Sequence, residues 1–156
     1  MGQGLGDILP PLPEDQEYVL YVMSSDRTAV AAAARQPLDQ TRYQNDGTAD
    51  FYLTEIGMEE TVSGALHDCA LELKDIKANR NVFRNQTSFS TLGIVDAVTP
   101  AATRVGAHYK LDKAYRIGPS GSFAPLVENL NASSARTVRV TLIGYQALKK
   151  GVERAT

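Results

Sequence analysis

The residues best suited to acid–base chemistry are two histidines and a scattered set of carboxylates. His67 is followed at once by Asp68, which suggests a general base beside its orienting acid. Adjacent residues on a β-strand point to opposite faces, so this pair is not expected to interact. We interpret His67 as a core residue with a backbone partner, and the other histidine, His108, is distant in the sequence. The sequence therefore predicts no catalytic residue.

Paired carboxylates form the second candidate chemistry, because glycoside hydrolases place two of them across a cleft. The acidic residues considered are Glu59, Glu60, Asp68, Glu72 and Asp75. Acidic residues in such segments are usually solvated, and we expect no enzyme here. Neither a Gly-x-Ser-x-Gly nucleophile elbow nor a phosphate-binding glycine loop occurs in the sequence.

Metal and cofactor sites are not expected. A zinc site needs a cluster of cysteines and histidines, and the chain offers only Cys69, His67 and His108. A single cysteine cannot form an intrachain disulfide, so stability must come from packing or assembly.

Composition places the chain among ordinary globular proteins. It has 156 residues, 43% hydrophobic and 22% charged, with a net charge of -2. This charge does not favour a nucleic-acid partner. We expect no membrane association, because no apolar run approaches the roughly 18 residues of a membrane span. The start has no signal-peptide pattern, and Gly6 stands where N-myristoylation requires Ser or Thr.

Short segments of alternating or β-branched character dominate the sequence. They predict strands at residues 17–24, 51–56, 65–73, 86–98, 107–117, 123–130 and 137–148. Residues 28–35 fit either a short helix or a strand. We predict an all-β fold, a single β-sandwich or jelly-roll-like domain over residues 17–148.

Several strands carry more specific expectations. Residues 17–24 are apolar on both faces, which favours burial in a sandwich or an interface. In residues 65–73 the face containing Cys69 and Leu71 should point inward. Residues 123–130 and 137–148 are predicted to be the two strands of a hairpin.

The first 16 residues read as an extended N-terminal arm, because glycines and then three prolines exclude helix and central strand. The segment nevertheless contains four large aliphatic residues: Leu5, Ile8, Leu9 and Leu12. We expect them to bind a partner, with folding back over the chain's own core as the alternative. Residues 149–156 are expected to be a polar C-terminal tail.

The C-terminal part of the sequence resembles that of small virion structural proteins of tailed bacteriophages. Those proteins end in a strand, an Asn-Leu-Ser type loop and a strand closing on Gly-Tyr. Asn129-Leu130 and Gly144-Tyr145 occupy these places. The resemblance covers residues 123–146 and, faintly, residues 49–83. It implies a β-sandwich component of a phage head, neck or tail.

The expected function is accordingly structural and non-enzymatic. The first hypothesis is a capsid decoration protein, also called a cement protein, that stabilises the head of a tailed phage. It would be assembled into the virion in the host cytoplasm, and its partners would be the major capsid protein, other virion proteins or copies of itself. The alternatives are a neck or tail component of the virion and a glycan-binding β-sandwich module.

Overall fold

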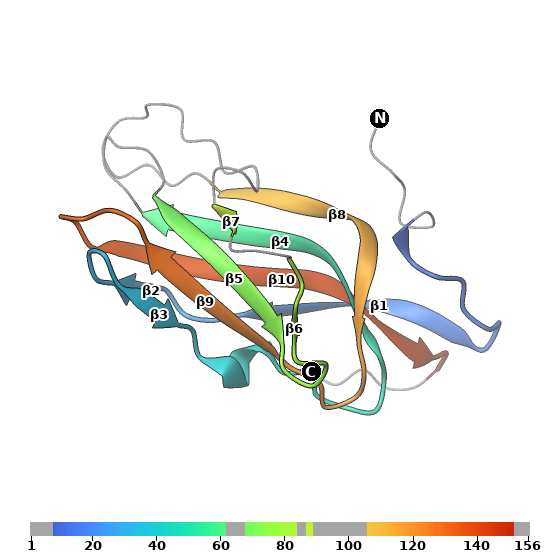
Figure 1. Cartoon of the computed structure of the whole chain (residues 1–156). Coiled ribbons are helices and arrows are strands. Elements are labelled where there is room, and N and C mark those ends of the chain that lie inside the picture. Colours follow the sequence, from blue (N-terminus) through green and yellow to red (C-terminus); the bar gives the residue numbers. More distant parts are fainter. Residues whose placement is uncertain (1–7, 62–67, 84–86, 89–105, 152–156) are drawn as a thin grey trace.

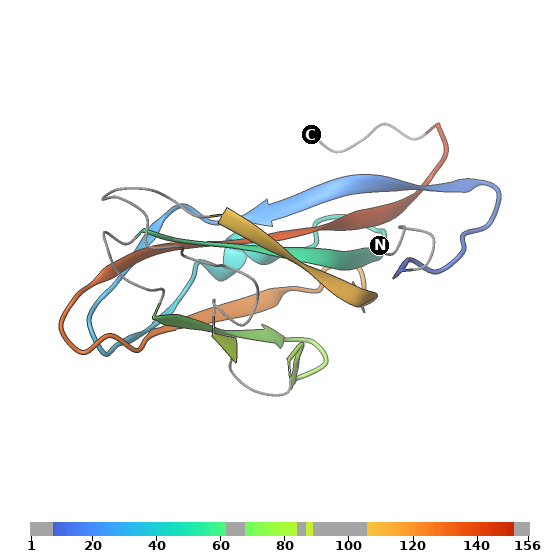
Figure 2. The same ribbon diagram turned by 90° about the horizontal axis from the view of Figure 1, so that it is seen from above.

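The computed structural model describes residues 8–61, 68–83, 87–88 and 106–151, which form two antiparallel sheets packed face to face. Figure 1 shows the strands from the side of the second sheet, and Figure 2 shows the two sheets as separate layers. The first sheet has the order β1 (Gln16–Ser24), β10 (Arg136–Lys149), β4 (Phe51–Thr61) and β8 (Gly106–Ile117), with β2 (Thr28–Val30) also paired to β10. The second has the order β3 (Arg35–Pro37), β9 (Phe123–Asn129), β5 (Cys69–Asp75) and β6 (Arg80–Asn81), with β7 (Thr87–Ser88) also paired to β5.

This strand order is that of a double-sheet jelly roll. β1 and β2 lie along the same strand, β10, and β6 and β7 lie along β5, so each pair counts as one strand. The first sheet then pairs the first strand with the last and the third with the sixth, while the second pairs the second with the seventh and the fourth with the fifth. Nested pairing of this kind arises when a long hairpin rolls up into two four-stranded sheets. The predicted all-β sandwich of jelly-roll type is confirmed.

The space between the sheets is filled mainly by apolar side chains that alternate along each strand, with the buried carboxylate Glu60 at its margin. The largest fully buried side chains are Tyr43, Phe51, Phe123, Leu53, Ile56, Met58, Leu71, Leu73, Leu142 and Glu60. Burying one large aliphatic or aromatic side chain contributes roughly 1.5–3 kcal/mol. The core is therefore the main source of stability, as the predicted inward face of β5 and the alternation of β10 indicated.

Tyr43 fastens a short 3-10 helix, η1 (Gln40–Tyr43), to the first sheet. Asp39 caps this helix, since its side chain accepts the backbone N–H of Thr41 at 3.1 Å. The Tyr43 hydroxyl donates to the carbonyl of Val140 at 2.6 Å and accepts the N–H of Ser25 at 3.2 Å. Burial raises the pKa of this phenol above its ordinary value.

The predicted hairpin of the last two strands is wrong. β9 pairs with β3 and β5 in the second sheet, whereas β10 pairs with β1, β2 and β4 in the first. The loop after Asn129 crosses from one sheet to the other. Both strands bury every second residue, and this alternation is the same whether two strands pair or face each other across a core.

The inward face predicted for β4 also needs correction. β4 has a register shift between Leu53 and Glu55, so Ile56, expected on the face opposite Leu53, points inward with it. A β-bulge changes the inward set in this way by adding one residue to a strand. Of the two alternatives for residues 28–35, the strand is the one observed, since the segment contains β2 and the start of β3.

β1, β8, β9 and β10 lie within one residue of their predicted limits, whereas β4 continues to Thr61 and β5 spans Cys69–Asp75. β1 begins at Gln16 and β10 ends at Lys149, each one residue beyond the expected sandwich. Much of the strand expected at 86–98, and residues 65–67, lie outside the described residues. Within the described ranges no helix is long and apolar enough to cross a membrane.

Candidate functional site

The candidate carboxylates are held in ion pairs and hydrogen bonds rather than gathered around a cleft. Glu60 is fully buried and accepts the backbone N–H groups of Asp68 and Cys69, each at 3.0 Å. Arg136 lies between the two acids: its Nη2 donates to Asp68 at 3.0 Å, and its Nε lies 3.3 Å from Glu60. That Nε contact is electrostatic and does not meet hydrogen-bond geometry. Glu60, on β4, thus joins the first sheet to the start of β5.

The remaining acidic candidates have their own partners. Glu59 lies 3.1 Å from Arg27 and 3.9 Å from Arg139, and Glu72 lies 3.5 Å from Arg35. Asp75 accepts the Tyr115 hydroxyl at 2.9 Å. No group of three or more potential metal ligands occurs within the described residues. The arrangement supports stabilising roles for these acids.

Cys69 is fully buried next to Glu60. Burial, followed by the negative charge of Glu60, raises the pKa of this thiol far above its ordinary value of 9.0. A thiol held protonated is a poor nucleophile and a poor metal ligand. His67 lies outside the described residues, and the side chain of His108 is likewise not described.

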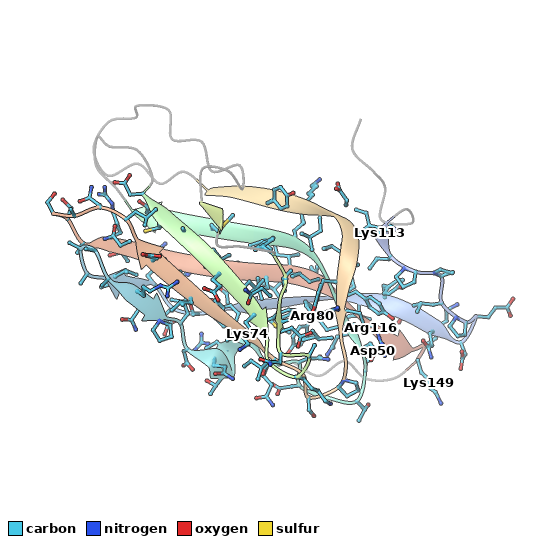
Figure 3. All side chains as sticks on the ribbon, viewed as in Figure 1. Asp50, Lys74, Arg80, Lys113, Arg116 and Lys149 are labelled. Atoms are coloured by element: carbon cyan, nitrogen blue, oxygen red, sulfur yellow. The ribbon has the colours of Figure 1, made fainter. Side chains whose placement is uncertain are left out.

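A charged pocket of about 240 Å³ lies at one end of the second sheet, lined by Asp75, Lys77, Arg80 and Arg116 among others. Arg80 donates to the Tyr115 hydroxyl at 2.7 Å, and its guanidinium lies over that ring, 5.1 Å from the centroid. Arg116 donates to Asp50 at 2.8 Å, and Figure 3 shows these two labelled residues side by side. The guanidinium groups therefore hold neighbouring elements together.

The N-terminal arm lies against the outer face of the first sheet over its described part. Leu9 is only 7% exposed, and the Tyr18 hydroxyl donates to the carbonyl of Pro10. Ile8 and Leu12 are half-buried, and Leu5 lies outside the described residues. The structure thus brings Leu9 onto the chain's own body and leaves parts of Ile8 and Leu12 accessible.

Two grooves follow the arm. One of about 750 Å³ is lined by Leu9, Pro10, Pro11, Leu12, Gln16, Glu17, Tyr18 and Tyr145. Another of about 330 Å³ is lined by Ile8, Leu9, Pro10, Tyr52, Lys113 and Ala114. Figure 3 places Lys113 on β8 beside the described start of the arm. Apolar and aromatic side chains line most of both grooves.

An apolar surface continues from these grooves along β1 and β10, and we call it the outer strip. Its members are Tyr18, Leu20 and Val22 of β1, Ile143 and Tyr145 of β10, and Tyr52 of β4. Cross-strand pairing sets Leu20 beside Tyr145 and Val22 beside Ile143. Leu20 is 58% exposed and Val22 is 51% exposed, so this part of the strip is open to solvent.

Three tyrosines order one end of the outer strip. The ring centroids of Tyr18 and Tyr52 are 5.7 Å apart, and those of Tyr18 and Tyr145 are 6.4 Å apart, all edge to face. The arm, the grooves and the outer strip together form the candidate functional site, a surface suited to binding apolar protein segments. The sequence signal for the strip was the apolar character of both faces of residues 17–24. One face of this segment is buried in the sandwich, as expected, and burial of the other face in an interface stays a prediction.

Comparisons with known proteins assign the chain to no family. No protein-family model matches the sequence, and no curated protein matches it. Similar solved structures include a chain of the cyanophage Pam1 capsid asymmetric unit, with a TM-score of 0.42, 15% identity, and coverage of 92% of this chain and 96% of that one. A chain of tomato aspermy virus has a TM-score of 0.40, 8% identity, and coverage of 99% and 92%; one of Nora virus has 0.35, 13%, and 99% and 69%. Because these TM-scores are below 0.5, the jelly-roll assignment rests on the strand order.

Proposed function

We propose that this protein is a non-enzymatic virion structural protein, a decoration or cement protein that stabilises the head of a tailed phage. The double-sheet jelly roll recurs in viral capsid proteins, lectins and cupins, so topology alone leaves several classes open. The resemblance of residues 123–146 to tailed-phage virion proteins favours the first class.

The observation that carries the proposal is where the apolar surface lies. The interior between the sheets is filled by packed side chains, while Leu20 and Val22 are exposed on the outer face. A small-molecule enzyme needs a concave site with convergent polar groups. An exposed apolar strip continuous with an arm instead suits attachment to other proteins.

The arm is the proposed contact with the partner, through Leu5, Ile8, Leu9 and Leu12. Leu9 anchors the described part of the arm to the body, and the accessible parts of Ile8 and Leu12 are presented to a neighbour. A single attachment of this size is weak, but many copies on one lattice gain strength through multivalency. The proposed partners are the major capsid protein, other virion proteins and further copies of this chain.

Binding to particles that lack the protein tests this proposal. The variant Ile8→Asp/Leu12→Asp places charges on the accessible part of the arm, and Leu130→Asp is the matched control, since Leu130 is 58% exposed on the loop after β9. Wild type and the control should co-sediment with such particles, whereas the arm variant should stay in solution. Equal binding by all three proteins would show that the arm does not form the contact. Absence of wild-type binding would contradict the virion role.

A neck or tail position in the virion is the nearest alternative. It uses the same fold and the same kind of contacts, so copy number separates the two. A decoration protein occurs in numbers comparable with the major capsid protein, and a neck or tail component in far smaller numbers.

A glycan-binding module is the second alternative, favoured by one observation. Tyr18 and Tyr145 line the larger groove, and tyrosine combines a flat apolar face with a polar hydroxyl. A glycan array probed with the full chain tests it. Specific binding that is lost on Tyr145→Ala would support the lectin reading over the structural one.

A further inference from the structure

We propose that the free edge of β1 pairs with the same edge of a second copy, so that two first sheets join into one continuous sheet across a two-fold axis. The inference concerns this edge alone and does not depend on the virion role. Among the described residues, β1 pairs only with β10, which leaves its other edge without a neighbouring strand. Figure 1 shows β1 as an outermost strand of its sheet.

The backbone hydrogen bonds around β1 determine which of its residues face the open edge. In an antiparallel ladder, residues alternate between bonding to the partner strand and pointing away from it. Asp15 accepts the N–H of Lys150, so this pair is bonded across the ladder and the odd-numbered residues that follow in β1 face β10. The even-numbered residues therefore direct their N–H and C=O groups to the open edge.

Three independent contacts agree with the assignment of the even-numbered residues to the open edge. The N–H of Gln16 turns away from β10 to the carbonyl of Pro13, at 3.0 Å. The N–H of Ala147, opposite Tyr18, points away from β1 to the carbonyl of Asp50. At the other end, the carbonyl of Ser24 accepts Nε of Arg42 at 3.3 Å. Tyr18, Leu20 and Val22 lie between these ends and present their backbone groups to the edge.

The side chains along this edge carry none of the usual protection against pairing. Natural edge strands are blunted by lysine, proline, inward charges or bulges. β1 runs as Gln-Glu-Tyr-Val-Leu-Tyr-Val-Met-Ser, with one charge, Glu17, and no proline. Its register with β10 is continuous from Gln16 to Ser24, so no bulge twists the edge away. An exposed apolar strand with open backbone groups is a template for another strand.

The sequence of β1 is self-complementary in one antiparallel register. When Leu20 lies opposite Leu20 of the second copy, Tyr18 lies opposite Val22 and every residue that faces the edge meets another such residue. These three pairs are mutually bonded, each exchanging two hydrogen bonds, and all open groups of Tyr18, Leu20 and Val22 are used. Glu17 then faces Met23, so no like charges oppose each other.

This register also extends the outer strip across the two copies. A two-fold axis perpendicular to the sheet keeps both outer faces on the same side. Leu20 and Val22 of one copy would lie beside Leu20 and Tyr18 of the other, which covers the two exposed side chains from the edge. The match of hydrogen bonds, charges and apolar side chains is what favours a second copy over a different strand.

Introducing a charge at Leu20, the centre of the register, tests the pairing in the full chain. Leu20→Lys or Leu20→Glu sets like charges opposite each other across the axis, and because Leu20 is 58% exposed the monomer should fold normally by circular dichroism. In sedimentation velocity, wild type should have twice the mass of the chain and each variant should have the mass of one chain. An equimolar mixture of the two variants should regain the dimer mass. Leu130→Lys, equally exposed elsewhere, should remain dimeric.

Monomeric wild type would overturn the inference, as would variants that sediment like wild type or a mixture that stays monomeric. A cysteine cross-link checks the register separately. Bonded antiparallel pairs place Cα atoms about 5.5 Å apart, within disulfide range. Mild oxidation should therefore link Leu20→Cys to itself but leave Leu130→Cys unlinked, while native Cys69 is buried. Failure of the first to cross-link, or linking of both alike, would contradict this pairing.

Discussion

At the residue scale, a glycine sets how closely the sheets' aromatic core can pack. Gly144 faces inward on β10, where a Cβ would lie 2.1 Å from the carbonyl oxygen of Tyr52 and 2.6 Å from Cζ of Phe51. Both atoms belong to buried or paired groups that have little room to move. The sequence gave no sign of this contact.

Gly144→Ala should therefore destabilise the fold by about 1–3 kcal/mol through overpacking. Urea denaturation followed by circular dichroism measures the change. Gly118→Ala is the control, because its nearest non-neighbouring atom lies 3.9 Å away, and it should shift stability by less than about 0.5 kcal/mol. Equal stability of the two variants would mean that β10 approaches β4 less closely than described.

Two adjacent glutamates should differ sharply in their contribution to stability. Glu60 is fully buried between Arg136 and two backbone N–H groups, so Glu60→Ala should cost about 3–5 kcal/mol. Glu59→Ala should cost less than about 1 kcal/mol, because its ion pairs with Arg27 and Arg139 lie near the surface. Thermal unfolding of both variants gives the comparison, and similar losses would contradict the buried placement of Glu60.

Cys69 should be unreactive in the folded protein. Burial and the charge of Glu60 raise its pKa, so the folded state binds the thiol proton more tightly than the unfolded state does. This contribution to stability is complete below the ordinary pKa of 9.0 and diminishes as the pH rises above it. An aromatic disulfide reagent at pH 8 should label the thiol only after urea is added. Rapid labelling without urea would show an accessible thiolate.

At the scale of elements, alternation identified the strands but not their partners. β1, β8, β9 and β10 lie within one residue of their expected limits, because period-two burial is a local property of each strand. The hairpin was wrong because partners are set by how the whole chain rolls up. The register shift in β4 went unforeseen because one added residue changes the face of Ile56 without changing composition.

In the candidate site, too, local features could be predicted from the sequence but spatial arrangement could not. The aliphatic residues of the arm and the two apolar faces of residues 17–24 could be read from the sequence. Their continuity could not, because the outer strip combines Tyr18 with Tyr52 and Tyr145 from distant parts of the chain.

Proline substitution in β1 tests the direction of its backbone groups. Leu20→Pro removes an N–H that faces the open edge, whereas Tyr21→Pro removes one that faces Gly144 of β10. Each proline variant is compared with the alanine variant at its own position, because Tyr21 packs against Phe51 whereas Leu20 is 58% exposed. Relative to alanine, we expect Tyr21→Pro to lose about 1–3 kcal/mol more stability than Leu20→Pro in urea denaturation. The reverse order would contradict the assigned phase of the ladder.

At the scale of the whole molecule, a closed apolar interior is combined with an open apolar exterior. The jelly roll supplies a rigid body, and the arm, grooves and outer strip lie together on one face of the first sheet. This arrangement suits contacts with neighbouring proteins. It is the basis of our proposal that the protein is a structural component of a virion head.

Quantitative mass spectrometry of purified virions from the source that encodes this chain tests that claim most directly. The ratio of this protein to the major capsid protein should be comparable with one, and it should fall sharply when the arm carries Ile8→Asp/Leu12→Asp. A protein that is absent from washed particles while abundant in the lysate would contradict the account.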